Sequence, residues 1–583
     1  MTPLIEKTYD RTLYNLPADC SEVWLFEGIA ARQRLEQARG FPVRSAYKTL
    51  LHDVLERDLL RGVAKAVIHY PVLPGDEPLR FRLECYPLGE MCQTRIEFQP
   101  ASQPGDSMPH YRIEREGLPS VIVPVPVRQV TLGDGSNCFA ACGWMRRGDQ
   151  SAPLETDYEK IFRDVTGAMN QIEITDRRPI FDQLIVDVTA PFQDLPLPVG
   201  KERISLAEAL HEDVYFAAIE VFQACLGLEQ GARDLQHGQV VPLIRIGEKP
   251  SLKMWLAKAD LSKDHDLGGV PVLHDATHWL TPRQIDGHLD EIGGTRFETT
   301  SRQGRPVAGI VVNPEAPVQL AISSGQHSNE TSPVVGALRA GYELRDMKVG
   351  FTLCPMENPD GYALFRRLCR DNESYMHHAA RYTAGGNDLS FATGYESRIR
   401  QMARERLPAD VHVNLHGYPS HEWTRPLSGY VPRGFARWTL PKGFFLICRH
   451  HPGWGDLAKL VVEAAITAIA GHPEQMRQNA MMMRRYLAAN PTPDFEVARG
   501  CIPHSTTETE SEPYPVALIT EAPDETIDGE DFRIAQESQY RVVLEIARAL
   551  QSTLAHAPSK ERSEEPGTSQ INSIASAATG PWA

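Results

Sequence analysis

The chain has 583 residues, too many for one hydrophobic core, so we expect two or three domains. Apolar residues make up 42% and charged residues 23%, as in ordinary globular proteins, and the net charge of −16 argues against an extended nucleic-acid-binding surface. The chain does not open on a basic segment followed by an apolar run, and no stretch has the roughly 18 apolar residues of a membrane span. We therefore expect a cytoplasmic protein without a nucleic-acid or membrane partner, whose ten cysteines are reduced thiols.

The first 150 residues predict an accessory domain with helices in front and β-strands behind. Two helices are expected, over Ser21–Gly40 and Ser45–Gly62, because each segment ends at a glycine that suits a C-cap. Residues 63–147 contain short β-rich runs broken by Pro, Gly and Asp.

Residues 151–276 predict a mixed α/β connecting region. Its longest feature is an amphipathic helix over residues 205–228 with Ser205 as N-cap. His211 and Glu212 lie on this helix, but no further residue follows at a metal-ligand spacing. We interpret them as surface or packing residues.

From residue 277 the pattern alternates between strands and helices, which is typical of an α/β domain. The apolar strands are RPVAGIVV, VQLAISSG, VGFTLCPM, DVHVNLHG and PVALITEA, and residues 533–556 form a closing helix. The predicted fold class is therefore α/β, with an α/β/α domain around a central mixed sheet over residues 277–556. Residues 557–583 are poor in large apolar side chains and predict a disordered tail.

A histidine and a glutamate three residues apart can reach one metal ion if the backbone turns between them, and this spacing occurs twice. His327 and Glu330 follow the strand VQLAISSG and precede a predicted helix. Ligands of α/β sheets bind at such strand-to-helix turns. His288 and Glu291 have the same spacing but lie within a predicted helix on a polar stretch, so we expect no metal there.

Two further strands end at residues suited to the same site. DVHVNLHG ends at His416, whereas His412 within it is interpreted as a packed strand residue, and PVALITEA ends at Glu521. Three protein ligands with an open position for water are the pattern of catalytic zinc. We predict one zinc ion per chain on His327, Glu330 and His416, with Glu521 as a base; the alternative is isolated polar residues at strand ends.

In this order the motifs resemble those of the carboxypeptidase A-like zinc metallocarboxypeptidases, or funnelins, over about residues 277–555. SRQGRPVAGIVV is similar to the family's early strand, HSNE at 327–330 to its zinc motif, and ENPDGY at 357–362 to its Asn-Pro-Asp-Gly-Tyr turn. RLCR at 367–370 resembles the family's Arg-Leu-Trp-Arg, which implies that Arg370 is the catalytic arginine. His416 then matches the third zinc ligand, and residues 521–524 match the Glu-x-x-Asp around the general base.

One part of the family pattern is missing. The family has an Asp-x-Asn-Arg motif whose Asp orients a zinc histidine and whose Asn-Arg pair binds the substrate's terminal carboxylate, whereas residues 385–391 here read GGNDLSF. Asp388 or Asn387 could take the place of the Asp, and Arg381 is one nearby substitute for the clamp.

The resemblance implies zinc-dependent hydrolysis of an amide bond, most directly removal of a C-terminal residue from a peptide. An amidase or deacylase that acts on a small amide or a modified peptide is the alternative, because the carboxylate clamp is absent from its usual place. A non-catalytic binding protein is a third reading, against which the complete set of site residues argues. The sequence leaves the oligomeric state open.

Overall fold

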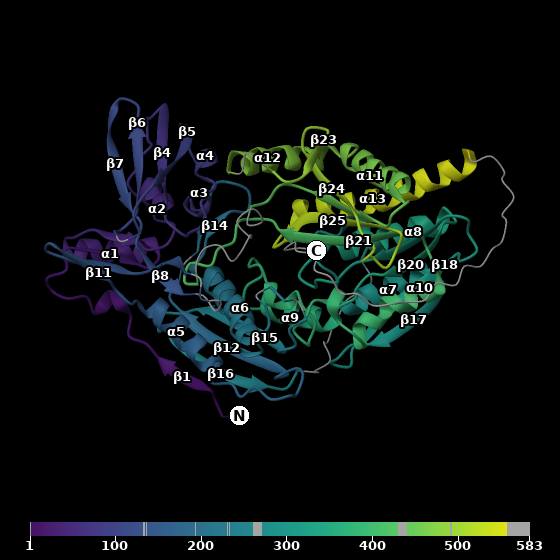
Figure 1. Cartoon of the computed structure of the whole chain (residues 1–583), viewed down its shortest axis with the longest axis horizontal. Coiled ribbons are helices and arrows are strands. Elements are labelled where there is room, and N and C mark those ends of the chain that lie inside the picture. Colours follow the sequence, from purple (N-terminus) through teal and green to yellow (C-terminus); the bar gives the residue numbers. More distant parts are fainter. Residues whose placement is uncertain are drawn as a thin grey trace.

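The computed structural model describes residues 2–105, 107–131, 135, 137–192, 194–229, 231–232, 234–259, 271–428, 440–489 and 493–556. The predicted tail at 557–583 lies outside these residues. The protein is a mixed α/β structure (Figure 1). Within the described ranges, none of the helices combines the length and the apolar character needed to cross a membrane.

One large mixed sheet dominates the C-terminal half. Its strands lie in the order β17-β18-β20-β19-β21-β25-β22-β24-β23. Their bounds are β17 (Thr295–Thr300), β18 (Pro306–Val312), β19 (Gln319–Ser323), β20 (Gly350–Cys354), β21 (Val411–Pro419), β22 (Phe445–His450), β23 (Glu496–Ala498), β24 (Ile502–Glu508) and β25 (Val516–Glu525). The central strands β20, β19, β21 and β25 are parallel to one another. All five strands predicted in this region are confirmed.

Several helices of this half pack on the sheet, whose strands are largely buried, and others pack on those helices. They are α7 (Pro282–Ile292), α8 (Ser332–Asp346), α9 (Pro359–Cys369), α10 (Arg398–Arg406), α11 (Gly455–Ala470), α12 (Pro473–Ala489) and α13 (Gly529–His556). Leu353 of β20 belongs to the main core with residues of α8, whereas the next residue, Cys354, packs in a separate cluster with Ile399 of α10. Since successive strand residues point to opposite faces, α8 and α10 lie on opposite sides of the sheet.

The N-terminal half consists of smaller sheets with a few helices. The strands are β1 (Ile5–Thr8), β2 (Glu22–Leu25), β3 (Val43–Ser45), β4 (Lys65–Val72), β5 (Arg95–Ser102), β6 (His110–Arg115), β7 (Leu118–Pro124), β8 (Val127–Thr131), β9 (Asn137–Ala141), β10 (Trp144–Arg147), β11 (Gln150–Pro153), β12 (Gln183–Ala190), β13 (Leu195–Pro196), β14 (Arg203–Ile204), β15 (Gln239–Ile246) and β16 (Ser251–Ala257). They form the sheets β1-β16-β12-β15, β11-β10-β2-β3 and β5-β4-β6-β7 and the pairs β8-β9 and β13-β14. The helices are α1 (Ile29–Arg39), α2 (Thr49–Glu56), α3 (Arg80–Glu84), α4 (Leu88–Met91), α5 (Asp157–Met169) and α6 (Leu206–Cys225). The domain boundaries given above stay predictions.

The start of the first predicted helix is wrong. Glu22–Leu25 forms strand β2, and helix α1 begins only at Ile29. β2 is buried along its whole length, between β10 and β3, with Trp24 opposite Trp144. Pairing with distant strands overrides the local helical preference here, because it buries Trp24 and partly covers Trp144.

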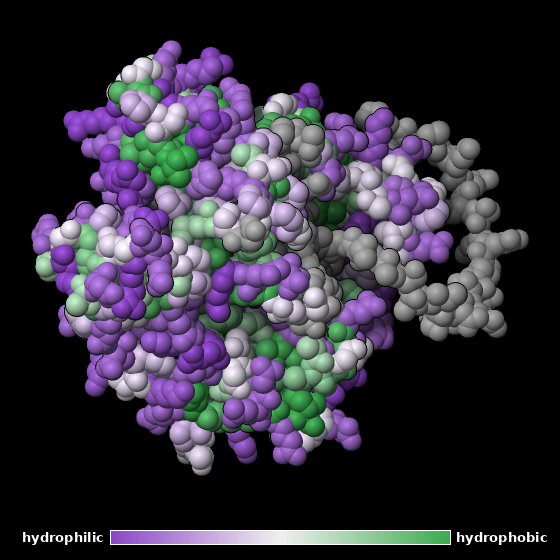
Figure 2. All heavy atoms as spheres, turned by 60° about the vertical axis from the view of Figure 1, so that its left-hand side comes forward, coloured by the Kyte–Doolittle hydropathy of each residue, from purple (hydrophilic) through white to green (hydrophobic). Residues whose placement is uncertain are grey.

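Helix α6 joins the two halves. Its predicted N-cap is confirmed, since the Ser205 hydroxyl accepts a hydrogen bond from the Glu208 backbone N–H at 3.0 Å. Figure 1 shows α6 near the centre of the molecule, between the sheet that contains β12 and β15 and the elements around β21. The face of the molecule in Figure 2 is mostly hydrophilic, with smaller groups of apolar residues between the hydrophilic ones.

Candidate metal centre

Three residues from the β19–α8 turn and the neighbouring strand β21 converge at the carboxyl edge of the large sheet. Histidine nitrogens of His327 and His416 and a carboxylate oxygen of Glu330 all lie within 4.8 Å of one another. His327 follows β19, after a turn at Gly325 with φ of +66°, and Glu330 directly precedes the segment that opens α8. His416 lies on β21, which continues to Pro419 rather than ending at His416 as predicted. The structure therefore brings together the three predicted ligands.

The spacing of the donor atoms suits a small cation. His327 Nδ1 lies 2.9 Å from Glu330 Oε1, His416 Nδ1 lies 2.9 Å from Glu330 Oε2, and the two Nδ1 atoms are 3.1 Å apart. Tetrahedral zinc with bonds of about 2.0–2.1 Å needs ligand atoms about 3.3 Å apart. All three side chains are buried, so their lone pairs face one another rather than water. The donor set, two imidazoles and one carboxylate, is one that zinc takes in catalytic sites.

Glu330 is held as a carboxylate. Its Oε2 accepts a hydrogen bond from the Gly417 backbone N–H at 3.0 Å, and its Oε1 accepts one from the Arg381 guanidinium at 2.8 Å. Burial raises the pKa of Glu330, but the charges of His327, His416 and Arg381 outweigh burial and lower it below its ordinary range. Burial also lowers the pKa of His416 to about 4, although Glu330 opposes this, so His416 is neutral at pH 7, as a metal ligand must be.

Asp388 takes the orienting place beside His327. Its Oδ2 lies 3.4 Å from His327 Nε2, and its Oδ1 accepts hydrogen bonds from the Gln326 side chain and the Ser390 backbone N–H, both at 3.0 Å. Burial raises the pKa of Asp388, but its bonds to His327 and Ser390 lower it further, so the group stays ionised. A carboxylate on the outer ring nitrogen fixes the ring for metal binding through Nδ1.

Asn387 does not share this place. Its Oδ1 accepts a hydrogen bond from the Thr383 hydroxyl at 2.6 Å, which ties the turn from 383 to 387. Of the two candidates for the orienting residue, Asp388 is thus the one in contact with His327.

The assignment of Arg370 requires a correction. Arg370 is exposed and forms the C-cap of α9, whose opposite end, at Asn358, adjoins the site. The 11 residues of α9 separate the two ends by about 16 Å. Arg381, which comes 11 residues later and is buried, is the guanidinium in contact with Glu330. The sequence motif pointed to Arg370 because the motif is local, whereas the chain between the two arginines folds back over the site.

Glu521 lies beside the cluster. It is paired in register with His416 across the parallel strands β21 and β25, so both side chains leave the sheet on the same face. Burial and the neighbouring charge of Glu330 raise the pKa of Glu521 well above its ordinary value. The buried Lys442, whose pKa burial lowers to about 7, is a cation near Glu521 that the sequence reasoning missed.

The family-like Asp of residues 521–524 has a structural role. Asp524 accepts hydrogen bonds from the backbone N–H groups of Thr331 and Ser332, at 2.5 and 3.0 Å. It thus caps α8 from a neighbouring strand, whereas no side-chain cap comes from Thr331 itself, the N-cap residue. A carboxylate at a helix N-terminus is favourable, and this one locks β25 to the turn that carries Glu330.

The NPDGY turn is bonded to the segment that carries the candidate ligands, because the Ser328 hydroxyl donates to the Asn358 carbonyl at 2.6 Å. The Asn358 side chain caps α9 by accepting from the Gly361 backbone N–H at 2.9 Å. Asp360 accepts from Ser301 at 2.7 Å and from Arg305 at 2.9 Å, so the two motifs that seemed separate in the sequence bind each other.

Gly361 has no room for a side chain, and Gly361→Ala should destabilise the protein. An added Cβ would lie 2.5 Å from the Asn358 side chain and 2.6 Å from both the Ala380 carbonyl and the Ser328 hydroxyl. Overpacking of this kind costs about 1–3 kcal/mol, which a thermal melt would register as a lower midpoint. Gly167→Ala is the control: Gly167 lies within α5 with open space around it, so alanine there should leave the midpoint unchanged or raise it. Equal midpoints for the Gly361 variant and wild type would contradict this packing.

The second His-x-x-Glu pair is not part of the metal cluster. His288 is buried although it lies on a polar stretch of sequence, and its Nδ1 lies 3.0 Å from the Tyr342 hydroxyl, which in turn donates to Glu291 at 2.8 Å. His412 packs as predicted, with its Nε2 2.8 Å from the Ser323 hydroxyl.

The interpretation of His211 and Glu212 as surface or packing residues misses a connection to the site. Both are buried, and the Glu212 carboxylate binds the His378 ring. His378 in turn faces Glu525, four residues beyond Glu521. The sequence offered one signal, a histidine next to acidic residues on a largely apolar helix. The partner His378 lies too far along the chain for a local pattern to pair it with Glu212.

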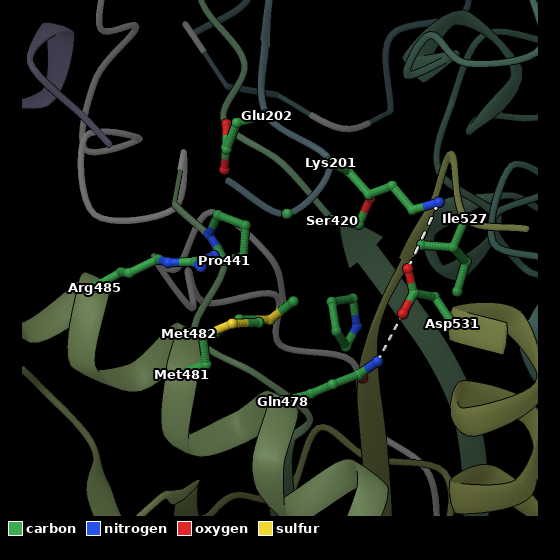
Figure 3. A pocket seen from close by; sticks show the side chains of 12 residues that line it. Lys201, Glu202, Ser420, Pro441, Gln478, Met481, Met482, Arg485, Ile527 and Asp531 are labelled. Atoms are coloured by element: carbon green, nitrogen blue, oxygen red, sulfur yellow. Dashed lines mark hydrogen bonds and ion pairs between the residues drawn. The ribbon is translucent and has the colours of Figure 1, made fainter. Parts of the chain in front are cut away.

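A pocket of about 80 Å³ is lined by residues from both halves of the chain. Figure 3 shows Lys201 and Glu202 from the N-terminal half facing Gln478, Met481, Met482 and Arg485 of α12. Asp531 accepts a hydrogen bond from Gln478 at 2.9 Å and lies 3.6 Å from Lys201. Ser420 and Pro523, which line the same pocket, come four residues after His416 and two after Glu521, whereas His327, Glu330, His416 and Glu521 themselves do not line it.

No protein-family model and no curated protein matches the chain. Among solved structures, the chain is similar to a metallo-carboxypeptidase from Burkholderia cenocepacia, at 13% identity over 53% of this chain and 76% of the other, with a TM-score of 0.29. It is also similar to a metallo-carboxypeptidase from Pseudomonas aeruginosa in complex with (2-guanidinoethylmercapto)succinic acid, at 12% identity over 52% and 72%, with a TM-score of 0.30. Carboxypeptidase A from Helicoverpa armigera matches at 12% identity over 54% and 90%, with a TM-score of 0.30. The similarity to these metallo-carboxypeptidases extends over about half of the chain. Because the identities and TM-scores are low, the function is argued from the geometry of the site.

Proposed function

We propose that this chain is a zinc-dependent hydrolase of amide bonds that removes the C-terminal residue of a peptide. The observation that carries the proposal is the convergence of His327, Glu330 and His416 beside a buried Glu521 at one edge of the sheet. Zinc on these three side chains would act as a Lewis acid and lower the pKa of water to about 7. The spacing of the donor atoms, the neutral His416 and the orienting Asp388 support zinc at this place.

Glu521 is the proposed base. It would take a proton from the attacking water and deliver it to the departing amine. Proton transfer by a positioned side chain typically contributes a factor of about 10²–10⁴ to the rate. A raised pKa in the metal-free protein fits this role, because a group that binds a proton readily can also carry it to the leaving group.

Arg381 is the proposed receptor for the terminal carboxylate. It is a buried guanidinium at the metal cluster, and guanidinium groups bind carboxylates with paired hydrogen bonds. This assignment replaces the Asn-Arg clamp of the family's Asp-x-Asn-Arg motif, at whose positions this chain has Ser390 and Phe391.

The amidase or deacylase remains the second candidate, and the absence of an Asn-Arg pair next to Asp388 is the observation that favours it. Asn387, the amide nearest to Asp388 in the sequence, accepts a hydrogen bond from the Thr383 hydroxyl, so its side-chain oxygen is engaged within its own turn.

A matched pair of peptides separates the two candidates. The zinc-loaded protein is incubated with a panel of N-acetylated tripeptides, each with a free and an amidated C-terminus, and products are identified by mass spectrometry. We expect cleavage of the free acids with kcat/KM at least about 100-fold above that of the amides, because one buried charged pair is worth roughly 3 kcal/mol. Equal cleavage of both forms would favour the amidase, and zinc binding without any turnover would favour a binding protein.

A further inference from the structure

A row of buried charges runs from helix α6 to the metal cluster. The His378 ring donates through Nδ1 to Glu212, and its Nε2 lies 3.9 Å from Glu525 Oε2. Arg381 lies 3.9 Å from Glu525 Oε1 and 2.8 Å from Glu330 Oε1. From Glu212 to Glu330 the charges alternate in sign, so each group has an opposite charge on every side along the row.

The row crosses from one half of the molecule to the other. Glu212 lies on α6, in the N-terminal half, and is fully buried, whereas His378 belongs to a short 3-10 turn, η3 (His378–Ala380), that precedes Arg381. The aromatic rings of Phe216 and Trp423 pack on the His378 ring, with centroids 5.4 and 5.2 Å away. The imidazole is therefore surrounded by two rings and two carboxylates, and its side chain is 1% exposed.

These charges hold one another ionised. Burial lowers the pKa of His378, but Glu212 and Glu525 outweigh burial and raise it above its ordinary value, while Arg381 opposes them. Burial raises the pKa of Glu212, but His378 and His211 lower it to about 2. Buried ions are costly unless they are paired, so loss of one member weakens its neighbours in the row.

Glu525 is the weakest member. Neither of its carboxylate oxygens has a hydrogen-bond partner within the described part of the chain, although both face a cation at 3.9 Å. Burial raises the pKa of Glu525 to about 7, and the charges of His378 and Arg381 act against burial. If His378 lost its proton, Glu525 would depend on Arg381 alone and would compete with Glu330 for that guanidinium.

We propose that Glu212 is a positioning residue of the metal site: through His378 and Glu525 it sets the place of Arg381, so that Arg381 can bind the carboxylate of a substrate. This inference rests on the proposed function for its substrate class. It means that the N-terminal half is an integral part of the active site, because a single carboxylate from α6 starts the row.

The first test is binding of a product-like peptide to the metal-free protein. An N-acetylated tripeptide from the panel above, in free-acid and amidated forms, is titrated into wild type and Glu212→Gln by calorimetry. Wild type should prefer the free acid, and Glu212→Gln should weaken free-acid binding by about tenfold while leaving the amide unchanged. Glu220→Gln is the matched control: Glu220 lies two turns further along α6 and pairs with Arg425 instead, so peptide binding should stay at the wild-type value.

The second test is a double-mutant cycle with turnover on the zinc-loaded protein. Glu212→Gln should raise KM for the free acid about tenfold with little change in kcat, and should add nothing further once Arg381→Lys is present. In wild type, KM for the free acid should rise with pH as His378 loses its proton and no longer pairs with Glu525. In Glu212→Gln this rise should begin at lower pH, because His378 has lost the carboxylate that stabilises its proton.

The outcomes separate this proposal from the proposed function. If wild type discriminates between free acid and amide but Glu212→Gln behaves as wild type, or impairs both forms equally, Glu212 does not position Arg381 and the inference is overturned. If wild type neither cleaves nor prefers free acids, the carboxypeptidase activity fails first and the inference falls with it. Circular dichroism and zinc content that match wild type establish that the variant is folded.

Discussion

Replacement of His416 by alanine should lower the affinity for zinc by about a hundredfold or more and abolish hydrolysis. Zinc held by four ligands contributes about 10–16 kcal/mol in small structural sites, or roughly 3 kcal/mol for each ligand, which corresponds to about two orders of magnitude. His416 also faces His327 and Glu330 directly, so its loss leaves their donor atoms without the third member of the cluster. The measurement is metal content after dialysis, together with the dissociation constant from competition with a chelator.

His412→Ala is the matched control. It removes an imidazole from the same strand, four residues earlier, whose ring contacts Ser323 rather than the cluster. This variant should keep one zinc per chain, even if it is somewhat less stable. One equivalent of tightly bound zinc in His416→Ala would mean that the ion binds elsewhere, and the site described here would be wrong.

Much of the large sheet could be predicted from the sequence because its strands are continuous apolar runs, and such runs are typical of a sheet buried on both faces. The ligand positions followed from the same pattern. His327, Glu330 and His416 each stand where a predicted strand meets a turn, and parallel strands deliver their ends to one edge. The structure shows them in contact, and their role as zinc ligands stays a prediction that the experiments above test.

The parts that could not be predicted depend on contacts between distant segments. Arg370 and Arg381 are 11 residues apart, and the local sequence does not indicate which of them contacts Glu330. The contact depends on the path of the chain after α9, which brings Arg381 and not Arg370 to Glu330. The strand Glu22–Leu25 looked helical because its pairing with β10, more than a hundred residues later, is invisible in a local window.

Glu212 is the clearest case of this kind. It lies on a correctly predicted helix, yet its partner His378 is 166 residues away. A glutamate on a buried helix face must have a partner, since burying an unpaired carboxylate is costly. Burial itself, however, becomes known only when the two halves of the molecule are placed together.

Replacement of Glu521 by glutamine should keep the metal and lose the chemistry. Glutamine has the same size and can still hydrogen-bond, but it cannot take up and release a proton, so kcat should fall by about 10²–10⁴. Zinc content and the affinity for a free-acid peptide should remain close to wild type, because neither His327, Glu330 and His416 nor Arg381 is altered. Steady-state kinetics on the best-cleaved peptide, with metal analysis of the same sample, measures both parts.

The pH profile gives this prediction a second readout. In wild type, kcat/KM should fall at low pH as Glu521 becomes protonated and can no longer act as a base. Burial and Glu330 raise the pKa of Glu521, whereas a bound cation would lower it, so the acidic limb should shift when zinc is replaced by another divalent metal. In Glu521→Gln the residual activity should lack this limb.

Glu508→Gln, at the exposed end of β24 in the same sheet, should keep the wild-type rate and profile. A Glu521→Gln variant with full turnover and an unchanged acidic limb would assign the base to another residue, and Glu525 would then be the next carboxylate to replace, because it lies in the same buried cluster.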